Sequence, residues 1–541
     1  AACSGSCAHP VNIIGPSNAS AIISGAQKIK GFRPINDPRI LEKLPRFARD
    51  YVLQSDLPGN GIQDFGAWKR RGWYNPITPM SLELYFKGQP TSMARWPNVG
   101  YAKIMALPEG KNGLVLSITG VDGKKWAGDP YLLATGYWSK YWSDETIPVD
   151  AVDAVNGTIK LSPPNPVFGM KTGQPVFIQH ALSELDQPGE WYLERGTGQM
   201  YFWPPTAIGA EDIEVSVAND LLVIDGANHI NISGITLEGA RGDGLTIRNA
   251  HNVSVSHARI RNIGNRAAVI GGKDNGLSEV LIENINEGGV ILDGGDRITL
   301  APGGLYVENS TLRRFNLVSR TVHPAVRING VGNRVSGNTI HDAPHSAIMF
   351  LGNDHVIAHN DIHDVCLETG DAGAIYTGRD WTARGTLISD NKLHDIPANV
   401  EKGGTVGVYL DDQASGITVR NNRIDGMNLG IQIGGGRDNL IEGNTLSNQA
   451  TAAIHLDARG TSRQKKQTDD PTWTLRTRLK DVPYDSPIYR ERYSNLAEIL
   501  NDEPGTPKYN ILRNNQISGT QAMRILDRAE RFLGSERSEA Q

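Results

Sequence analysis

A short pattern that recurs along the chain restricts its fold more than any other sequence feature. The pattern alternates apolar residues, continues with an asparagine and returns to an apolar residue two positions later. Clear copies contain Asn309, Asn338, Asn360, Asn391, Asn422, Asn444 and Asn515, and looser copies stand near Gly234, His257 and Asn284. From 234 to 444, the spacing ranges from 22 residues (Asn422 to Asn444) to 31 residues (Asn360 to Asn391). Such a period is typical of a solenoid with one coil per repeat.

The alternation inside each copy has period two, which indicates β-strands with one face turned inward. No segment of the repeat region keeps apolar residues at helical spacing over three turns. The asparagines fall where the chain must bend, and they can bond between coils about 4.8 Å apart. The 60 glycines suit turns that need positive φ. The sequence therefore predicts an all-β fold, a right-handed parallel β-helix.

A second strand recurs within the same coils, as in AVRI at 325, AIYT at 374 and GVYL at 407. Because side chains alternate along a strand, the third position of each copy is expected to face outward. These positions form a row of Arg327, Met349, Tyr376, Tyr409, Gln432 and His455. A row so rich in polar and aromatic side chains favours a binding face over a merely solvated one.

The repeat divides the chain into four expected parts. They are an N-terminal segment with a first coil at Ala21 to Phe32 (1–64), an inserted β-rich domain (65–207), the β-helix core with a groove (208–460), and a helical insertion with a final coil and tail (461–541). The inserted domain holds eight of the ten tryptophans, which are expected mainly in its core. A helix over Tyr493 to Leu500 is expected to cover the open C-terminal end of the solenoid.

Charge and cysteine content narrow the range of partners and locations. A net charge of -5 does not suggest a basic surface that binds nucleic acid. The sequence contains no run of eighteen apolar residues, so it predicts no membrane span. Of the three cysteines, Cys366 is expected to be a buried spectator. Cys3 follows two alanines, as in a bacterial lipoprotein after cleavage, although a bridge to Cys7 or two free thiols stays open. We expect a secreted or periplasmic monomer, with a lipid anchor at Cys3 as one alternative.

The two coils of 31 residues carry the candidate chemistry. Insertions in a solenoid become loops on one face, often the binding face. Asp371 precedes the outward strand of the first long coil, and Asp412 follows that of the next. Glycoside hydrolysis generally needs two carboxyl groups flanking the bond, and neighbouring coils can supply one each. The sequence therefore predicts Asp371 and Asp412 as a catalytic pair.

A family resemblance rests on four runs: GDAGAIYTGRDW at 370–381, GVYLDD at 407–412, IGGGRDN at 433–439 and AIHLDARG at 453–460. They resemble the β-helix enzymes of glycoside hydrolase family 141, which include α-L-fucosidases and a xylanase. The runs at 93–98 and 184–205 are similar to the same family, so the resemblance covers most of the chain. It implies two catalytic aspartates and places them on Asp371 and Asp412.

Further candidates lie in the long loops, along the outward row or beside it. The expected substrate-binding residues are His345, Glu368, Tyr376, Arg379, Asp380, Trp381, Tyr409, Asp411, Arg437 and His455. Trp381 is a candidate stacking surface for a sugar ring. Asp411 has a counterpart in Asp293 of an earlier coil, which favours a structural role. His341, His363 and His394, each followed by aspartate, are expected to form a structural ladder.

Together these features predict an extracytoplasmic glycoside hydrolase acting on an oligo- or polysaccharide that contains α-L-fucoside or xyloside. No cofactor or metal is expected, and a structural or lyase-type calcium ion stays open. One alternative is a polysaccharide lyase, which needs a basic residue and often a cation, although the long loops contain a single lysine, Lys402. A non-catalytic adhesin is the other alternative, since fold alone does not fix function.

Overall fold

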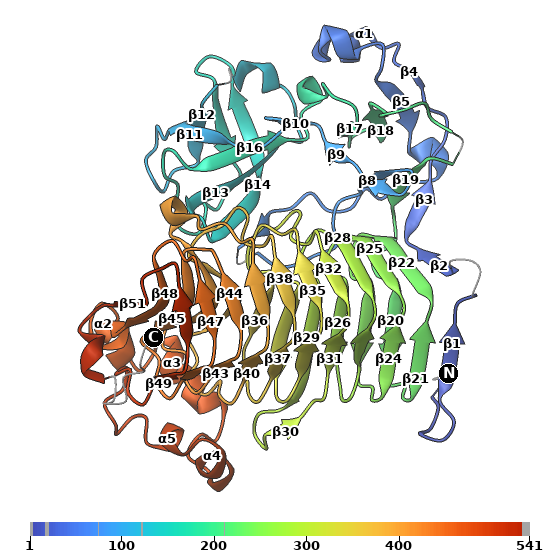
Figure 1. Cartoon of the computed structure of the whole chain (residues 1–541). Helices are drawn as coiled ribbons and strands as arrows, with labels where there is room; N and C mark the ends of the chain where they lie inside the picture. Colours follow the sequence, from blue (N-terminus) through green and yellow to red (C-terminus); the bar gives the residue numbers. More distant parts are fainter. Residues whose placement is uncertain (1–3, 17–20, 74, 121–122, 210, 533–541) are drawn as a thin grey trace.

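The computed structural model describes residues 4–16, 21–73, 75–120, 123–209 and 211–532. Three long parallel sheets wind along one axis as a right-handed parallel β-helix, which confirms the predicted fold class (Figure 1). Cys3, the expected lipid-anchor site, lies outside the described residues. Cys366 is fully buried, as expected. No helix among the described residues is long and apolar enough to cross a membrane.

Each coil gives one strand to each sheet. The first sheet runs from β1 (Val11–Ile14) through β21 (Ile230–Ser233) to β49 (Ile511–Arg513), and the second from β2 (Ala21–Ser24) through β22 (Ile235–Ala240) to β50 (Gln516–Ser518). The third sheet carries the candidate site. Its parallel strands are β20 (Leu222–Asp225), β23 (Leu245–Arg248), β26 (Ala268–Gly271), β29 (Val290–Asp296), β33 (Val326–Gly330), β36 (Ile348–Phe350), β39 (Ala372–Gly378), β42 (Thr405–Asp411), β45 (Leu429–Gly434), β48 (Ala452–Asp457) and β51 (Met523–Ile525), and the short β30 (Ala301–Pro302) pairs antiparallel with β29.

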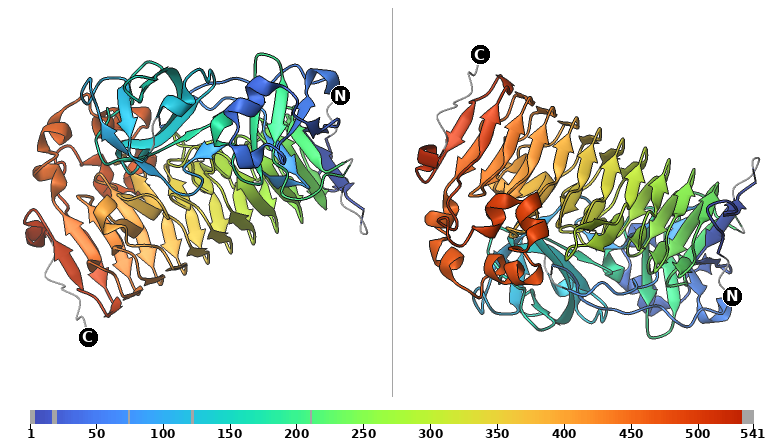
Figure 2. Two further views of the ribbon diagram at one scale, coloured as in Figure 1. Left: turned by 90° about the horizontal axis from the view of Figure 1, so that it is seen from above. Right: turned by 90° about the horizontal axis from the view of Figure 1, so that it is seen from below.

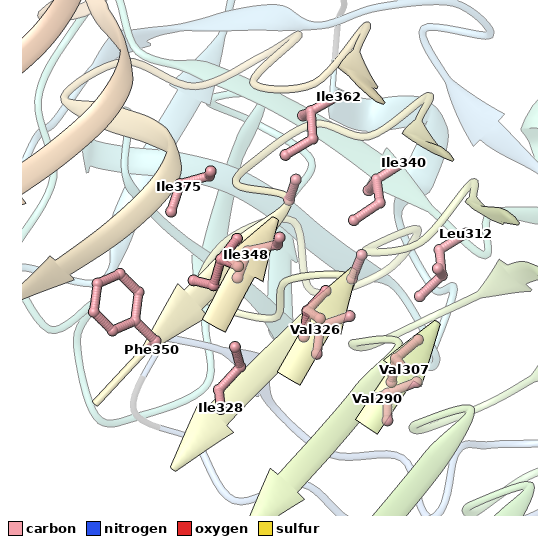
Figure 3. Packing of buried hydrophobic residues seen from close by; sticks show 14 of the residues in the cluster. Val290, Val307, Leu312, Val326, Ile328, Ile340, Ile348, Phe350, Ile362 and Ile375 are labelled. Atoms are coloured by element: carbon pink, nitrogen blue, oxygen red, sulfur yellow. The ribbon is translucent and has the colours of Figure 1, made fainter. Parts of the chain in front are cut away.

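Like residues stack along the interior of the solenoid. Val290, Val326, Ile348 and Ile375 occupy matching positions in four successive strands of the third sheet, and all are buried. Figure 3 shows this file facing side chains from the other sheets, such as Ile340. Period-two alternation therefore builds one continuous apolar core along the axis. The register is strongly fixed, because a slip by one residue would turn that file toward water.

Buried asparagines form a second internal file. The side-chain amide of Asn338 donates to Asn360 at 3.0 Å, Asn360 to Asn391 at 2.9 Å, and Asn391 to Asn422 at 2.9 Å. The same amides also donate to backbone carbonyls, as Asn391 does to Ile357 at 2.9 Å. The predicted bonding between stacked asparagines is confirmed. It satisfies backbone groups at the bends that would otherwise be buried without partners.

The chain leaves the solenoid directly after β2 and returns at β20. The first coil ends at Ser24 rather than continuing to Phe32, because β3 (Ala26–Lys28) pairs antiparallel with β19 (Ile213–Ser216). The excursion is therefore wider than the expected 65–207. Its other strands are β4 (Arg33–Pro34), β5 (Leu53–Asp56), β6 (Arg71–Gly72), β7 (Leu84–Phe86), β8 (Gln89–Pro90), β9 (Ser92–Met93), β10 (Arg95–Trp96), β11 (Ala102–Ala106), β12 (Val115–Ile118), β13 (Leu133–Lys140), β14 (Ser143–Asp153), β15 (Thr158–Leu161), β16 (Pro175–Gln179), β17 (Glu190–Glu194) and β18 (Gln199–Phe202).

This inserted domain lies along one side of the solenoid (Figures 1 and 2). Trp126, Trp138 and Trp191 are buried inside it, as expected of core tryptophans. Its largest sheet has eight strands and includes β13 and β14, which form its longest hairpin. That hairpin carries aromatic residues toward the long coils, so the domain reaches the part of the solenoid where the candidate chemistry lies.

Short helices follow β48: α2 (Lys465–Asp469), α3 (Thr474–Arg478), α4 (Pro487–Arg492) and α5 (Ser494–Ala497). The expectation that this insertion covers the open end of the solenoid is wrong. Trp381 of a long coil forms an apolar cluster with Leu475 and Tyr489, so the helices pack on the flank (Figure 2). The terminal 3-10 turn Ala529–Phe532 instead packs against the solenoid core through Ala529.

Candidate active site

The outer face of the third sheet carries the predicted row as one continuous file. Arg327 pairs in register with Met349, Met349 with Tyr376, and Tyr376 with Tyr409. The file continues through Gln432, His455 and Arg524. Neighbouring members are one strand spacing apart, about 4.8 Å. A groove that follows this file therefore runs along the solenoid axis across successive coils.

Two hollows lie along the file. The first, of about 240 Å³, extends over Arg327 and Met349, and Trp73 and Trp142 of the inserted domain line it. The second, of about 430 Å³, is lined by Tyr409, Gln432, His455, Arg459 and Gln464, among others. Asp371, Arg379 and Asp411 line both hollows. We therefore treat the two hollows as halves of one groove, with these three residues at its centre.

Asp371 is exposed at the start of β39. Its backbone is left-handed (φ 52°), and its N–H donates to the carbonyl of Gly404 at 2.7 Å. The hydroxyl of Tyr409, from the next coil, donates to its Oδ1 at 3.0 Å. A turn and one neighbouring tyrosine thus hold the carboxyl in the groove while leaving it open to a ligand.

Asp411 and Asp412 end β42 on the coil after Asp371. Asp411 accepts hydrogen bonds from the Tyr376 hydroxyl at 3.0 Å and from Arg459 Nη1 at 2.5 Å. Burial raises the pKa of the Asp411 carboxyl to about 6, and the negative charge of Asp412 adds to that rise. Asp411 therefore takes up a proton under mildly acidic conditions.

Asp412 has the opposite environment. Burial favours its protonated form, but Arg379, Gln464 and Arg459 together outweigh that effect and lower the pKa of Asp412. Its oxygens accept from Arg379 Nε at 2.5 Å, from Gln464 Nε2 at 2.5 Å and from Arg459 Nη1 at 3.3 Å. The carboxylate consequently stays ionised and fixed in orientation at the edge of the second hollow.

Arg459 is a central residue that the sequence analysis did not single out. Its guanidinium bonds to Asp411, to Asp412 and, through Nη2 at 2.8 Å, to Asp457. A Cβ on Gly434 of the previous coil would lie 2.6 Å from the Arg459 Cζ atom, so glycine leaves room for that guanidinium. The sequence contained a signal in its run AIHLDARG, where Arg459 closely follows the outward strand.

The structure places the histidine candidates in the two hollows. His345 lines the first hollow, where its Nδ1 lies 3.0 Å from Thr369 Oγ1, and burial lowers its pKa to about 3. It is therefore neutral at ordinary pH. His455 lines the second hollow, with Nε2 at 3.3 Å from Asp457. Its Nδ1 is buried without a partner among the described residues.

Three predicted substrate-binding residues do not line the groove. Trp381 is 1% exposed and lies under the helical insertion, so it offers no stacking surface for a sugar. Asp380 accepts from Thr382 N at 2.9 Å and lies 3.4 Å from Arg297. Arg437 bonds to Asp502 in the helical insertion. All three hold that insertion or its supporting loop in place.

Glu368 also lies outside both hollows. Its carboxylate binds Arg320 and accepts from the hydroxyls of Tyr101 at 2.6 Å and Tyr137 at 3.0 Å. Since both tyrosines belong to the inserted domain, Glu368 joins that domain to the solenoid. Its oxygens are occupied by this junction, so the structure does not bring Glu368 together with the other predicted site residues.

The three repeated histidines form the expected structural ladder. The rings of His341 and His363 are stacked with centroids 4.8 Å apart, and those of His363 and His394 are 5.2 Å apart. Among the residues that the structure describes, no group of three or more His, Cys, Asp or Glu side chains is arranged to hold a metal ion.

Comparisons with known proteins agree with this architecture. Residues 324–466 match the family model described as the right handed beta helix region. No curated protein matches the sequence. The chain is similar to a solved structure described as a glycoside hydrolase, with a TM-score of 0.63, 15% identity and coverage of 82% of this chain and 84% of the other. It is also similar to XylC solved with xylose, with a TM-score of 0.51, 9% identity and coverage of 96% and 77%. These identities indicate a shared fold.

Proposed function

We propose that the protein is a carbohydrate-active enzyme, a glycoside hydrolase, that cleaves an oligo- or polysaccharide in this groove. One observation carries the proposal: carboxyl groups from two successive long coils line one groove, beside aromatic residues of the inserted domain. The structural neighbours support it, since one is described as a glycoside hydrolase and another was solved with xylose. The resemblance to glycoside hydrolase family 141 points the same way.

We assign the catalytic pair to Asp371 and Asp412. Asp412 is held ionised by two arginines, which suits a base that activates water or a nucleophile that attacks the anomeric carbon. Asp371 is exposed and, among the described residues, accepts one side-chain hydrogen bond, from Tyr409, so its carboxyl is open to the leaving oxygen as an acid. The two residues lie on adjacent coils, and both carboxyl groups are near enough to Asp411 to raise its pKa.

Asp411 is the competing candidate for the acid. Its pKa of about 6 is nearer to that of a working general acid than an ordinary aspartate's, and it lines both hollows. Asp411 is buried, and its two oxygens accept from Tyr376 and Arg459, whereas Asp371 is exposed; this comparison favours Asp371 as the acid.

The resemblance further supports an extracytoplasmic enzyme and a plant or algal substrate with α-L-fucoside or xyloside units. A screen of aryl α-L-fucoside, aryl β-xyloside, xylan, pectin and fucoidan, read by new reducing ends and by ultraviolet absorbance, tests this. Hydrolysis releases reducing ends without an absorbing product. An unsaturated, absorbing product would instead identify a lyase, and selective binding without turnover would identify an adhesin.

Asparagine variants test the residue assignment. Asp371→Asn and Asp412→Asn are expected to lower kcat by at least about 100-fold, because each loses a proton donor or a charged base. Asp411→Asn should keep measurable turnover, and Asp293→Asn, its exposed counterpart on an earlier coil, should match the wild type. If Asp411→Asn is inactive while Asp371→Asn is active, Asp411 takes the place of Asp371 as the acid.

A further inference from the structure

Arg327 stands on the floor of the first hollow. It belongs to β33, two coils before Tyr376 in the outward file, and it shares the lining of that hollow with Trp73 and Trp142. The separation from Tyr376 along the sheet is two strand spacings, about 10 Å. Arg327 therefore lies beside the proposed cleavage point rather than at it.

Within the part of the chain that the structure describes, the guanidinium of Arg327 binds neutral groups. Its bonds go to the backbone carbonyl of Val322 and, at 3.7 Å, to the sulfur of Met349. No carboxylate of the described residues forms an ion pair with it. By contrast, Arg379 and Arg459 both pair with Asp412 in the same groove. Arg478 also lines this hollow and donates to the backbone carbonyl of Arg379 at 3.0 Å. Arg327 is the member of the outward file in this hollow whose charge meets no acidic partner among the described residues.

The carboxylates of this hollow belong to later coils: Asp371 precedes β39 and Asp411 ends β42, two and three coils beyond Arg327. His345 and His323 lie near Arg327, and burial, together with nearby cations that include Arg327, lowers the pKa of both. The carboxylate of Glu287 lies 3.4 Å from His323 Nε2 and binds Arg71, not Arg327. Burying a cation without a counter-ion is costly, which favours a ligand that supplies one.

We infer that the first hollow binds a sugar residue that bears an anionic oxygen group, a carboxylate or a sulfate, and that Arg327 pairs with this group. The inference rests on the proposed function and narrows its substrate to acidic glycans. A guanidinium is suited to this task because its planar donors match two oxygens of one anion. The tryptophans of the inserted domain would contact the apolar face of the same sugar.

Binding calorimetry on the full chain, in an Asp371→Asn background to prevent turnover, tests the inference. The probes are oligogalacturonate with its carboxyl-reduced form, and a sulfated fuco-oligosaccharide with its desulfated form. For the correct anion class, the charged probe is expected to bind about 10- to 100-fold more tightly than its neutral form.

Arg327→Met should abolish that preference and Arg327→Lys should keep part of it. Arg334→Met, an exposed arginine on the first sheet, should change nothing.

Equal binding of charged and neutral probes in both pairs would overturn the inference, and that comparison does not depend on whether the Arg327 variants fold. A preference that survives Arg327→Met but is lost in Arg478→Met would also overturn it, since Arg478 lines the same hollow. Failure of the proposed function looks different. In that case the charge preference persists, while the wild-type protein releases no reducing ends from the acidic glycans that it binds.

Discussion

At the scale of single residues, two neighbouring aspartates of the groove have pKa values shifted in opposite directions. Burial and the negative charge of Asp412 raise the pKa of Asp411 by more than the nearby Arg459 lowers it. Asp412 receives two arginines and a glutamine, so its pKa falls. General acid and base chemistry requires carboxyl groups whose pKa values differ in this way.

The raised pKa of Asp411 predicts a pH dependence of stability. Its folded pKa of about 6 lies above the unfolded value of about 3.9, so its favourable contribution is complete below pH 4 and disappears as pH rises through 6. The loss amounts to at most about 3 kcal/mol, or about 2 to 3 °C in Tm for a chain of this length. Asp411→Asn should remove this decline. Melting curves between pH 4 and 7 measure it, and parallel wild-type and variant profiles would contradict it.

At the scale of elements, the end of β45 shows how one coil shapes the site of another. Gly434 lies beside the Arg459 guanidinium, which three aspartates hold in place. Arg459 occupies the space that a side chain on β45 would fill. Crowding inside the groove therefore explains Gly434, the first glycine of the run IGGGRDN.

Gly434→Ala is expected to displace Arg459 and lower kcat by about 10- to 100-fold, because Asp412 loses one of its charged partners. Stability should change little, since the moved atoms lie at the tip of a side chain. Gly271→Ala is the matched control: it lies in the same sheet, and its added Cβ would be 3.4 Å from the nearest atom. Activity assays measure kcat and melting curves measure Tm for both variants. Unchanged kcat in Gly434→Ala would show that Arg459 does not support catalysis.

The asparagine file predicts a stability effect of its own. Asn391 donates to Ile357 O and to Asn422, and its Oδ1 accepts from the side chain and backbone N–H of Asn360. Asn391→Ala leaves these buried groups unpaired and should lower the free energy of unfolding by about 2 to 4 kcal/mol. Denaturant unfolding measures the loss, with the exposed Asn501→Ala as control. A loss equal to that of the control would show that the asparagine file does not stabilise the fold.

The solenoid could be predicted from sequence because each strand pairs with its counterpart one period away. The bends repeat in the same way, as the bonded pair Asn360 and Asn391 shows. The sequence could also place Asp371, Tyr376 and Asp412 on adjacent coils. It could not predict what covers Trp381 or Glu368, because their partners come from segments without the repeat. The sequence analysis therefore assigned both residues to the substrate, whereas they hold the two insertions.

At the scale of the whole molecule, the inserted domain enters beside the first coil yet contributes to a groove over the later coils. Its attachment there depends on buried polar contacts. Glu368 binds Arg320 and two tyrosines, and Asp144 of β14 accepts from Thr321 Oγ1 at 2.6 Å. These contacts position Trp142, and with it one wall of the first hollow.

Glu368→Gln is expected to loosen this junction. The substitution removes the charge that Arg320 and the two tyrosine hydroxyls share, which should cost about 1.5 to 3 kcal/mol. Because the inserted domain then holds Trp73 and Trp142 less firmly, KM should rise several-fold with a smaller change in kcat, and proteases should cut the domain faster. Glu308→Gln breaks an exposed ion pair on the first sheet and serves as control. If Glu368→Gln keeps the wild-type KM and protease resistance, other contacts hold the domain in place and Glu368 has no part in shaping the groove.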